Sequence, residues 1–257
     1  MAFSPANFSL DGKKALVTGG ASGIGAAIAE GLAASGADVC VTFNRRPADA
    51  TLEAIERTGR VGRALPCDVA ALDETGAAGL IASAREAVGG LDILVNNAGI
   101  IRRAPALDHG FEDWRTVMST NLDSAFVLSQ AAARMMAEAG GGKIVSVASI
   151  LAFQGGILVP SYTASKHALV GLTRALANEW AGRGINVNAI APGYTATSNT
   201  QALRDDPVRS AALLGRIPAG RFAEPDEMVG AVVFLCSPAA SYVHGSVVTI
   251  DGGWLSR

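Results

Sequence analysis

Residues 18–25 read TGGASGIG, directly after the short apolar run Lys14–Val17 and at the start of a helix-patterned segment that reaches Ser35. Glycines let a backbone approach a pyrophosphate closely, and a helix N-terminus offers free N–H groups with a partial positive charge. A turn of this composition that binds nothing has the same pattern, but a strand before it and a helix after it favour a dinucleotide site. The residues expected to bind the dinucleotide at this turn are Gly19, Ser22, Gly23, Ile24 and Gly25.

The rest of the chain repeats this alternation of strand and helix. Further strands are expected at residues 38–42, 62–66, 91–95, 143–147, 185–190 and 247–250. Further helices are expected at residues 48–57, 72–88, 111–139, 161–181 and 226–236. This pattern predicts one α/β domain over residues 1–257, of the Rossmann type, with a doubly wound, seven-stranded parallel sheet and helices on both faces. The long mixed segment 192–221 breaks the rhythm and is predicted to be a substrate lid.

The composition excludes several other classes of protein. The 257 residues are 49% hydrophobic and 17% charged, with 30 glycines, which excludes a disordered chain. With a net charge of −2 and scattered basic residues, we expect neither a nucleic acid nor an anionic membrane as partner. No signal-peptide pattern or bilayer-length apolar run is seen, so a cytoplasmic protein is expected. The chain has three cysteines, Cys40, Cys67 and Cys236. Their spacing is not that of metal ligands and their number is odd, so we expect neither a metal site nor a disulfide scaffold.

Polar residues at the ends of two later strands extend the expected dinucleotide site. Asp68 and Val69 follow the third strand, where a carboxylate can accept a hydrogen bond from an adenine amino group or cap a turn. The sequence NNAG at residues 96–99 follows the fourth strand and leaves room for a ribose, although an ordinary turn has the same composition. The residues expected to contact the dinucleotide here are Asp68, Val69, Asn96, Ala98 and Gly99.

The residues after the second strand bear on the choice between NAD and NADP. An acidic residue there would bind a ribose 2′-hydroxyl and repel a 2′-phosphate, but the sequence reads Asn44-Arg45-Arg46. We expect Asn44 and Arg45 at the nucleotide. The two arginines favour the extra phosphate of NADP, unless both are solvated loop charges.

Tyr162 and Lys166 are four residues apart in an expected helix and therefore share one of its faces. A nearby ammonium favours a phenolate, so Lys166 is expected to lower the pKa of the Tyr162 phenol from its ordinary value of about 10. A phenol tuned in this way can exchange a proton with a substrate oxygen near neutral pH. Because the same spacing occurs by chance on exposed helices, the pair has weight only together with other motifs.

Several motifs occur together along the chain. They are TGGASGIG (18–25), NNAG (96–99), Asn121, Ser149, Tyr162-x-x-x-Lys166 and Pro192-Gly193. In order and spacing, over nearly the whole chain, they resemble the short-chain dehydrogenase/reductase family. The resemblance implies an NAD(P)-dependent enzyme that interconverts a secondary alcohol and a ketone.

The resemblance also implies a role for each residue of the catalytic set. Tyr162 would be the general acid and base, and Lys166 would bind the nicotinamide ribose and lower the pKa of the phenol. Ser149 would hydrogen-bond the substrate oxygen, and Asn121 would hold a water that links Lys166 to solvent. The residues that would bind the nicotinamide end of the cofactor are Pro192, Gly193, Thr195 and Thr197.

Longer segments resemble members of this family that act on ketonic sugar acids in pectin and uronate breakdown. These segments are residues 96–103, 153–166, 178–200, 216–221 and 251–257. They imply a small sugar acid as substrate, NAD as cofactor with NADP as the alternative, and a cytoplasmic homotetramer.

A sugar acid needs a cation for its carboxylate. Arg102 or Arg103 is the first candidate and Arg221 a further one, although Arg102 and Arg103 could equally be surface or inter-subunit charges. Gln154 and Tyr194 are expected to bind substrate hydroxyls.

Two other readings fit these patterns. Within the family, the substrate could instead be that of a gluconate 5-dehydrogenase or a 3-oxoacyl-carrier-protein reductase. A dinucleotide-sensing regulator that has lost the chemistry is a protein of another class. Such a regulator typically lacks the tyrosine or the lysine, whereas Tyr162 and Lys166 are both present here.

Overall fold

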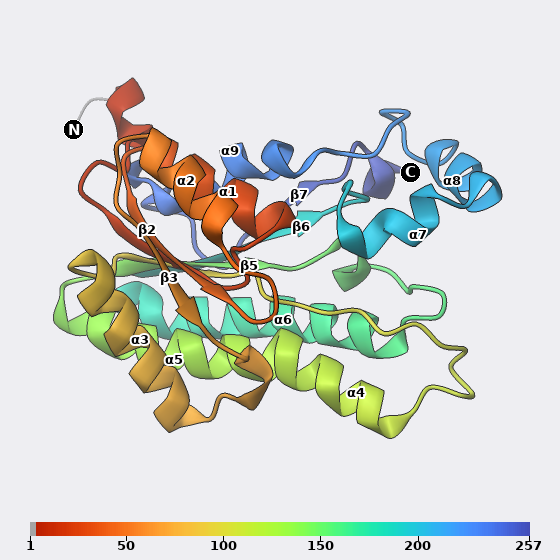
Figure 1. Cartoon of the computed structure of the whole chain (residues 1–257), viewed down its shortest axis with the longest axis horizontal. Coiled ribbons are helices and arrows are strands. Elements are labelled where there is room, and N and C mark those ends of the chain that lie inside the picture. The colour runs from red at the N-terminus through yellow and green to blue at the C-terminus, as the bar shows by residue number, and fades with distance from the viewer. Residues whose placement is uncertain (1–3) are drawn as a thin grey trace.

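The computed structural model describes residues 4–257 and is built around a seven-stranded parallel sheet (Figure 1). The strand order is β3-β2-β1-β4-β5-β6-β7. The strands are β1 (Lys14–Val17), β2 (Asp38–Phe43), β3 (Gly62–Pro66), β4 (Ile93–Asn96), β5 (Gly142–Val147), β6 (Ile185–Pro192) and β7 (Val247–Ile250). Every strand expected from the sequence is present, so the doubly wound Rossmann-type fold is confirmed.

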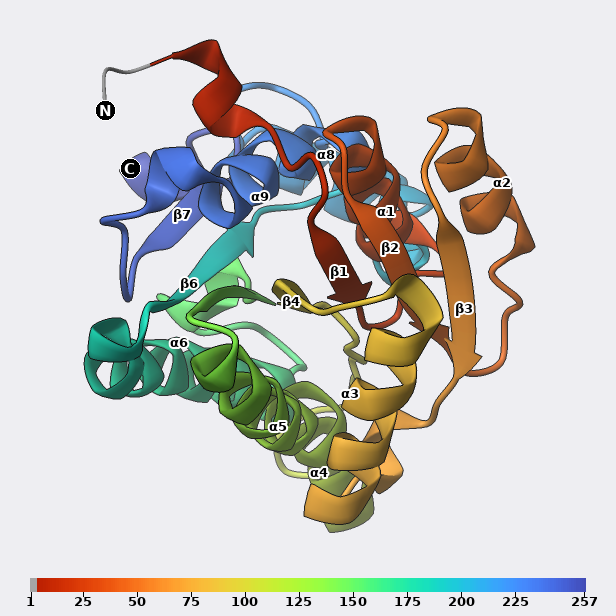
Figure 2. The same ribbon diagram turned by 90° about the vertical axis from the view of Figure 1, so that its left-hand side faces the viewer.

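Helices cover both faces of the sheet (Figure 2). On one face lie α1 (Gly23–Ala34), α2 (Asp49–Arg57) and α9 (Val229–Cys236); on the other lie α3 (Glu74–Val88), α4 (Phe111–Met118), α5 (Ser124–Glu138) and α6 (Pro160–Trp180). Ala15 and Val17 of β1 join the core beneath α1 and α9, whereas Leu16 joins the core beneath α3 and α5. Burial on both faces explains why the strands read as continuous apolar runs. Within residues 4–257 no helix is long and apolar enough to cross a membrane.

The order of the strands reverses between β3 and β4. Strands β2 and β3 lie on one side of β1. Helix α3 then returns the chain so that β4 pairs with the other side of β1. The loops that leave the carboxyl ends of β1 and β4 therefore diverge, and a crevice forms between them. Ligands of open α/β sheets bind at such a point.

The helix expected at residues 111–139 is interrupted. Between α4 and α5 the chain forms a π-helical turn, Ser119–Asp123, in which the Ser124 N–H donates to the Ser119 carbonyl. The Ser119, Thr120 and Ser124 hydroxyls each donate to the carbonyl four residues earlier. These hydroxyls satisfy backbone carbonyls around the bulge, where the regular hydrogen-bond ladder is disturbed.

After β6 the chain forms two short helices, α7 (Gln201–Arg204) and α8 (Pro207–Leu214), which lie next to each other at one end of the molecule (Figure 1). They belong to the segment 192–221. Its role as a lid stays a prediction.

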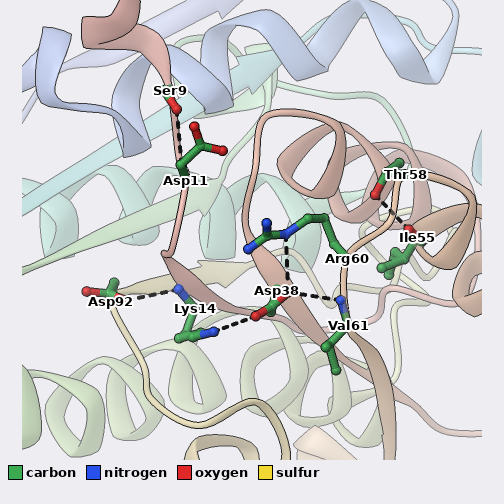
Figure 3. Close-up of polar contacts among 9 residues, drawn as sticks. All are labelled: Ser9, Asp11, Lys14, Asp38, Ile55, Thr58, Arg60, Val61 and Asp92. Atoms are coloured by element: carbon green, nitrogen blue, oxygen red, sulfur yellow. Dashed lines mark hydrogen bonds and ion pairs between the residues drawn. The ribbon is translucent and has the colours of Figure 1, made fainter.

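The amino ends of the strands hold a cluster of charged residues (Figure 3). Asp38, 7% exposed at the start of β2, accepts hydrogen bonds from the Lys14 ammonium and from the Val61 N–H at 2.9 Å, and pairs with Arg60 at 3.3 Å. Burial alone would raise the pKa of this carboxyl, but these partners hold the pKa below its ordinary value. These contacts tie β1, β2 and the entry to β3 together, so we interpret the cluster as structural.

Candidate active site

A cleft of about 570 Å³ runs along the carboxyl ends of the strands from β1 to β6. Of the residues expected at the dinucleotide, all but Asn96 line it. They are Gly19, Ser22, Gly23, Ile24, Gly25, Asn44, Arg45, Asp68, Val69, Ala98, Gly99, Tyr162, Lys166, Pro192, Gly193, Thr195 and Thr197. Residues that belong to no expected site also line the cleft, among them Thr42, Cys67, Asn97, Ile100, Thr116, Thr120 and residues 198–200.

The glycine-rich turn fits a pyrophosphate. Helix α1 begins at Gly23, and the side chain of the preceding Ser22 makes no capping hydrogen bond, so the first N–H groups of the helix are left for an anion in the cleft. Gly23 has a φ of +56°, and a Cβ built there would meet its nearest neighbour, the Thr197 methyl, only at 3.4 Å. A Cβ on Gly25 would instead lie 2.3 Å from Asn97 Nδ2. Gly25 therefore serves the packing of the turn, and Gly23 keeps the cleft open.

The asparagine that supports this turn is Asn97 rather than Asn96. Asn97 Nδ2 donates to the carbonyls of Thr18 at 2.9 Å and Gly19 at 3.2 Å. Asn96 is buried, and its Nδ2 donates to Ser129 Oγ at 2.9 Å beneath the sheet. Asn96 therefore does not line the cleft, and its contact with the dinucleotide stays a prediction. Because neighbouring residues at a strand end point to opposite faces, the alternation along β4 was the signal that could have separated the two.

The end of β2 leaves space for a charged group. Asn44 and Arg45 line the cleft, whereas Arg46 does not. Among residues 4–257 no carboxylate forms an ion pair with Arg45. Asp68 also lines the cleft and caps the turn after β3, where its carboxylate accepts from the Ala70 N–H at 3.2 Å. Its contact with the adenine stays a prediction.

Tyr162 and Lys166 lie on the first turns of α6 and face the cleft together. Lys166 is 3% exposed, and its Nζ donates to the Val147 carbonyl at 2.6 Å. The same Nζ lies 5.6 Å from the centre of the Tyr162 ring. Burial lowers the pKa of the Lys166 ammonium to about 8.

The phenol of Tyr162 behaves differently from the expectation. Burial raises its pKa above 10, and a hydrogen bond with Ser149 and the charge of Arg103 offset this only in part. The expectation that Lys166 lowers the pKa of Tyr162 is therefore wrong for this structure. The lysine ammonium is itself destabilised by burial and donates to a backbone carbonyl instead of to the phenol.

Ser149 follows β5 and caps a short 3-10 turn, where its Oγ accepts from the Leu151 N–H at 3.1 Å. Its hydroxyl also hydrogen-bonds the Tyr162 phenol. Two adjacent hydroxyls on the cleft wall can both donate to one substrate oxygen. This arrangement suits an alcohol or a ketone.

Asn121 lies in the π-helical turn and is 2% exposed, behind the cleft wall. Its Oδ1 accepts from the Ile100 N–H at 2.8 Å, and its Nδ2 donates to the Ile100 carbonyl at 3.0 Å and to Ser165 Oγ at 3.1 Å. Both amide hydrogens are thus used within the protein. The water-holding role of Asn121 stays a prediction.

The three candidate arginines differ in their partners. Arg102 is half-exposed and pairs with Asp113 at 3.3 Å. Arg221 makes a two-pronged ion pair with Glu227, at 2.6 and 2.7 Å. The guanidinium of Arg103 donates to a backbone oxygen at 3.0 Å, and no carboxylate among residues 4–257 pairs with it. Arg102 lines the cleft, whereas Arg103 and Arg221 do not. Arg103 is the candidate without a carboxylate partner, and its link to Asn199, which lines the cleft, brings it to the edge of the site.

The two residues expected to bind substrate hydroxyls, Gln154 and Tyr194, do not line the cleft. Tyr194 packs its ring against Trp254 at 4.9 Å and Phe222 at 6.2 Å. Its chain neighbours Gly193 and Thr195 do line the cleft. A contact of Gln154 or Tyr194 with substrate stays a prediction.

Comparison with known proteins agrees with this geometry. A family model described as enoyl-(acyl carrier protein) reductase matches residues 19–255. The chain is 50% identical over 252 residues to the 2-dehydro-3-deoxy-D-gluconate 5-dehydrogenase of Bacillus subtilis, which covers 97% of both chains.

Two solved structures are also similar to this chain. One, from Agrobacterium tumefaciens, is provisionally identified as a 2-deoxy-D-gluconate 3-dehydrogenase and has NADP bound. It is 53% identical, with a TM-score of 0.91 over 98% of this chain and 99% of its own. The other is a gluconate 5-dehydrogenase from Burkholderia cenocepacia in complex with NADP and tartrate, 38% identical, with a TM-score of 0.91 over 98% of both chains. The chain belongs to the short-chain dehydrogenase/reductase family.

Proposed function

We propose that this chain is a dehydrogenase that uses NAD or NADP to interconvert 2-dehydro-3-deoxy-D-gluconate and the corresponding 2,5-diketo acid. The observation that carries the proposal is the pair of hydroxyls of Ser149 and Tyr162 beside Lys166, in a cleft that also contains a phosphate-binding turn. Support for the substrate comes from the 50% identity to the Bacillus subtilis enzyme of that name, over nearly the full length of both chains.

The cleft residues suit this chemistry. The bound nicotinamide would supply or accept the hydride. The Ser149 and Tyr162 hydroxyls would hold the substrate oxygen, and Tyr162 would donate a proton to it in reduction and remove one in oxidation. Because burial raises the pKa of Tyr162, the phenol is protonated at neutral pH and ready to act as the acid. Oxidation requires the phenolate and should become faster as the pH rises.

A panel of substrates tests the proposal. Purified protein is assayed with 2-dehydro-3-deoxy-D-gluconate, D-gluconate and a 3-oxoacyl thioester, each with both cofactors. We expect the highest kcat/KM for the first compound. A higher kcat/KM for one of the other two compounds would make that compound the substrate instead. Binding of NADH without turnover of any compound would favour the dinucleotide-sensing regulator.

The cofactor preference should depend on Arg45. Replacing Arg45 with alanine should weaken NADPH binding about ten-fold and leave NADH binding nearly unchanged, because a charge-assisted hydrogen bond to the 2′-phosphate is lost. Fluorescence titration with each reduced cofactor measures this. Arg46→Ala is the matched control, since this neighbouring arginine does not line the cleft. If Arg45→Ala weakened the binding of NADH and NADPH equally, Arg45 would not contact the 2′-phosphate.

The carboxylate of the sugar acid should depend on Arg103. Arg103→Ala should raise KM for the sugar acid about ten- to a hundred-fold, since a charged hydrogen-bonding partner is lost, with nucleotide binding retained. Arg102→Ala is the comparison, because Arg102 lines the cleft but its guanidinium already pairs with Asp113. If Arg102→Ala had the larger effect on KM, the assignment would pass to that residue.

Three broader statements belong to the same proposal: a role in pectin and uronate breakdown, a cytoplasmic location and a homotetramer. Phe111 on α4 and Phe126 on α5, 71% and 40% exposed, are apolar side chains that a subunit contact would cover. Sedimentation velocity measures the assembly. The segment 192–221 is proposed as a lid because its residues 198–200 line the cleft and Arg103 donates to the Asn199 carbonyl.

A further inference from the structure

One fully buried hydroxyl next to the catalytic pair has no part in the chemistry described above. Ser165 lies on α6, directly before Lys166, and is 0% exposed. Its Oγ donates to the Tyr162 carbonyl at 2.8 Å and accepts from Asn121 Nδ2 at 3.1 Å. The hydroxyl therefore joins the turn of α6 that carries Tyr162 and Lys166 to another element of the protein.

That other element holds the cleft wall. The side-chain amide of Asn121 forms two hydrogen bonds with the backbone of Ile100, and Ile100 lines the cleft. A Cβ built on the neighbouring Gly99 would lie 3.4 Å from Asn121 Oδ1 and 3.7 Å from Lys166 Nζ. Loop, π-helical turn and α6 thus meet within a few ångströms of the lysine. Ser165 supplies the side-chain hydrogen bond between the π-helical turn and α6.

A second serine on the same helix shows that this arrangement is particular to Ser165. Ser161 is also 0% exposed, one turn earlier, but its Oγ has no hydrogen-bond partner among residues 4–257. The two residues share the helix, the burial and the size of the side chain, and they differ in their hydrogen bonds. A buried polar network whose members are all satisfied holds its groups in one arrangement.

We propose that Ser165 is a positioning residue for the reaction. Its hydroxyl links α6 to Asn121, whose amide is fixed by two hydrogen bonds to Ile100 (the Asn121–Ile100 clamp), and this link holds Tyr162 against Ser149. The inference rests on the proposed function, because it concerns the residues that would hold and protonate the substrate. Ser165 itself touches neither substrate nor cofactor. It acts through Tyr162 and Lys166, whose geometry decides how well a proton is transferred.

The test compares Ser165→Ala and Ser165→Cys with the control Ser161→Ala. Both Ser165 variants should lower kcat about ten-fold, with KM and nucleotide affinity nearly unchanged, and should shift the pH at which kcat for oxidation rises. Ser161→Ala should change none of these quantities. Wild-type kcat and pH profile in both Ser165 variants would overturn the proposal. If the alanine variant does not fold, the cysteine variant, which keeps the volume and hydrogen-bonds only weakly, decides on the same measurements.

Removing Asn121 as well identifies the route. If Ser165 acts through Asn121, the loss of kcat in the double variant Asn121→Ala/Ser165→Ala should be smaller than the product of the two single losses. Losses that multiply would show that Ser165 acts independently of the clamp and would overturn the proposed route. A wild-type protein that turns over no sugar acid would instead overturn the proposed function, which the substrate panel detects separately.

Discussion

Replacing Tyr162 with phenylalanine should lower kcat by about 10²–10⁴-fold, the range that a positioned general acid or base contributes. The change removes one hydroxyl and retains the ring, so nucleotide binding should be nearly unchanged. The physical reason is that Ser149 can still hold the substrate oxygen, but no group remains beside it to transfer a proton. Steady-state rates and a nucleotide titration on the same protein measure both quantities.

The chain provides its own controls, because it contains only three tyrosines. Tyr242 is 97% exposed, and Tyr242→Phe should leave kcat at the wild-type value. Tyr194 lies between the cleft residues Gly193 and Thr195 without itself lining the cleft, and Tyr194→Phe should have an effect between the two. Retention of most of the wild-type kcat by Tyr162→Phe would contradict the proposed role of this phenol.

Replacing Lys166 with methionine should lower kcat/KM at least about a hundred-fold without unfolding the protein. The ammonium is 3% exposed, and burial lowers its pKa from the ordinary 10.5 to about 8. At roughly 1.4 kcal/mol per unit, holding the charge there at neutral pH costs the fold about 3 kcal/mol. The variant avoids this cost but leaves the Val147 carbonyl without its donor, at a cost of about 1–3 kcal/mol. The free energy of unfolding should therefore stay level or rise.

The effect of Lys166 on stability has a defined dependence on pH. Between pH 8 and 10.5 the unfolded lysine binds more protons than the folded one, so the stability of the wild type should rise through this window relative to Lys166→Met. Lys143→Met is the matched control. Burial also lowers the pKa of Lys143, but its Nζ donates to Asn186 Oδ1 at 2.9 Å and it does not line the cleft, so activity should be retained. If Lys143→Met lost as much activity as Lys166→Met, the loss would come from removing a buried lysine in general, and a specific role of Lys166 in the reaction would be contradicted.

The central strands could be predicted from the sequence because they are buried on both faces and read as continuous apolar runs. Val247–Ile250 was found at its expected position even as the edge strand. The helical span at 111–139 was predicted but the π-helical turn within it was not, because such a bulge widens one turn without ending the helix. Its signal is the group of serine and threonine hydroxyls that donate to carbonyls around Asn121.

Within the site, the motif residues were brought together as expected, but their electrostatics depend on distances that no spacing encodes. Sequence alone left Arg102 and Arg103 equivalent, whereas the structure places Arg102 in the cleft lining and pairs it with Asp113, and bonds Arg103 to the Asn199 carbonyl. Likewise, the i, i+4 spacing placed Lys166 beside Tyr162, but it contained no information on the Val147 carbonyl that receives the ammonium. Burial, the larger effect on the pKa of Tyr162, is a property of the assembled fold.

The dependence of the oxidation rate on pH tests the central claim most directly. With 2-dehydro-3-deoxy-D-gluconate and saturating cofactor, kcat of the wild type should climb on the alkaline side as the Tyr162 phenol ionises, and this rise should be absent from the residual activity of Tyr162→Phe. A flat profile in the wild type, or the same rise in Tyr162→Phe, would show that another group moves the proton.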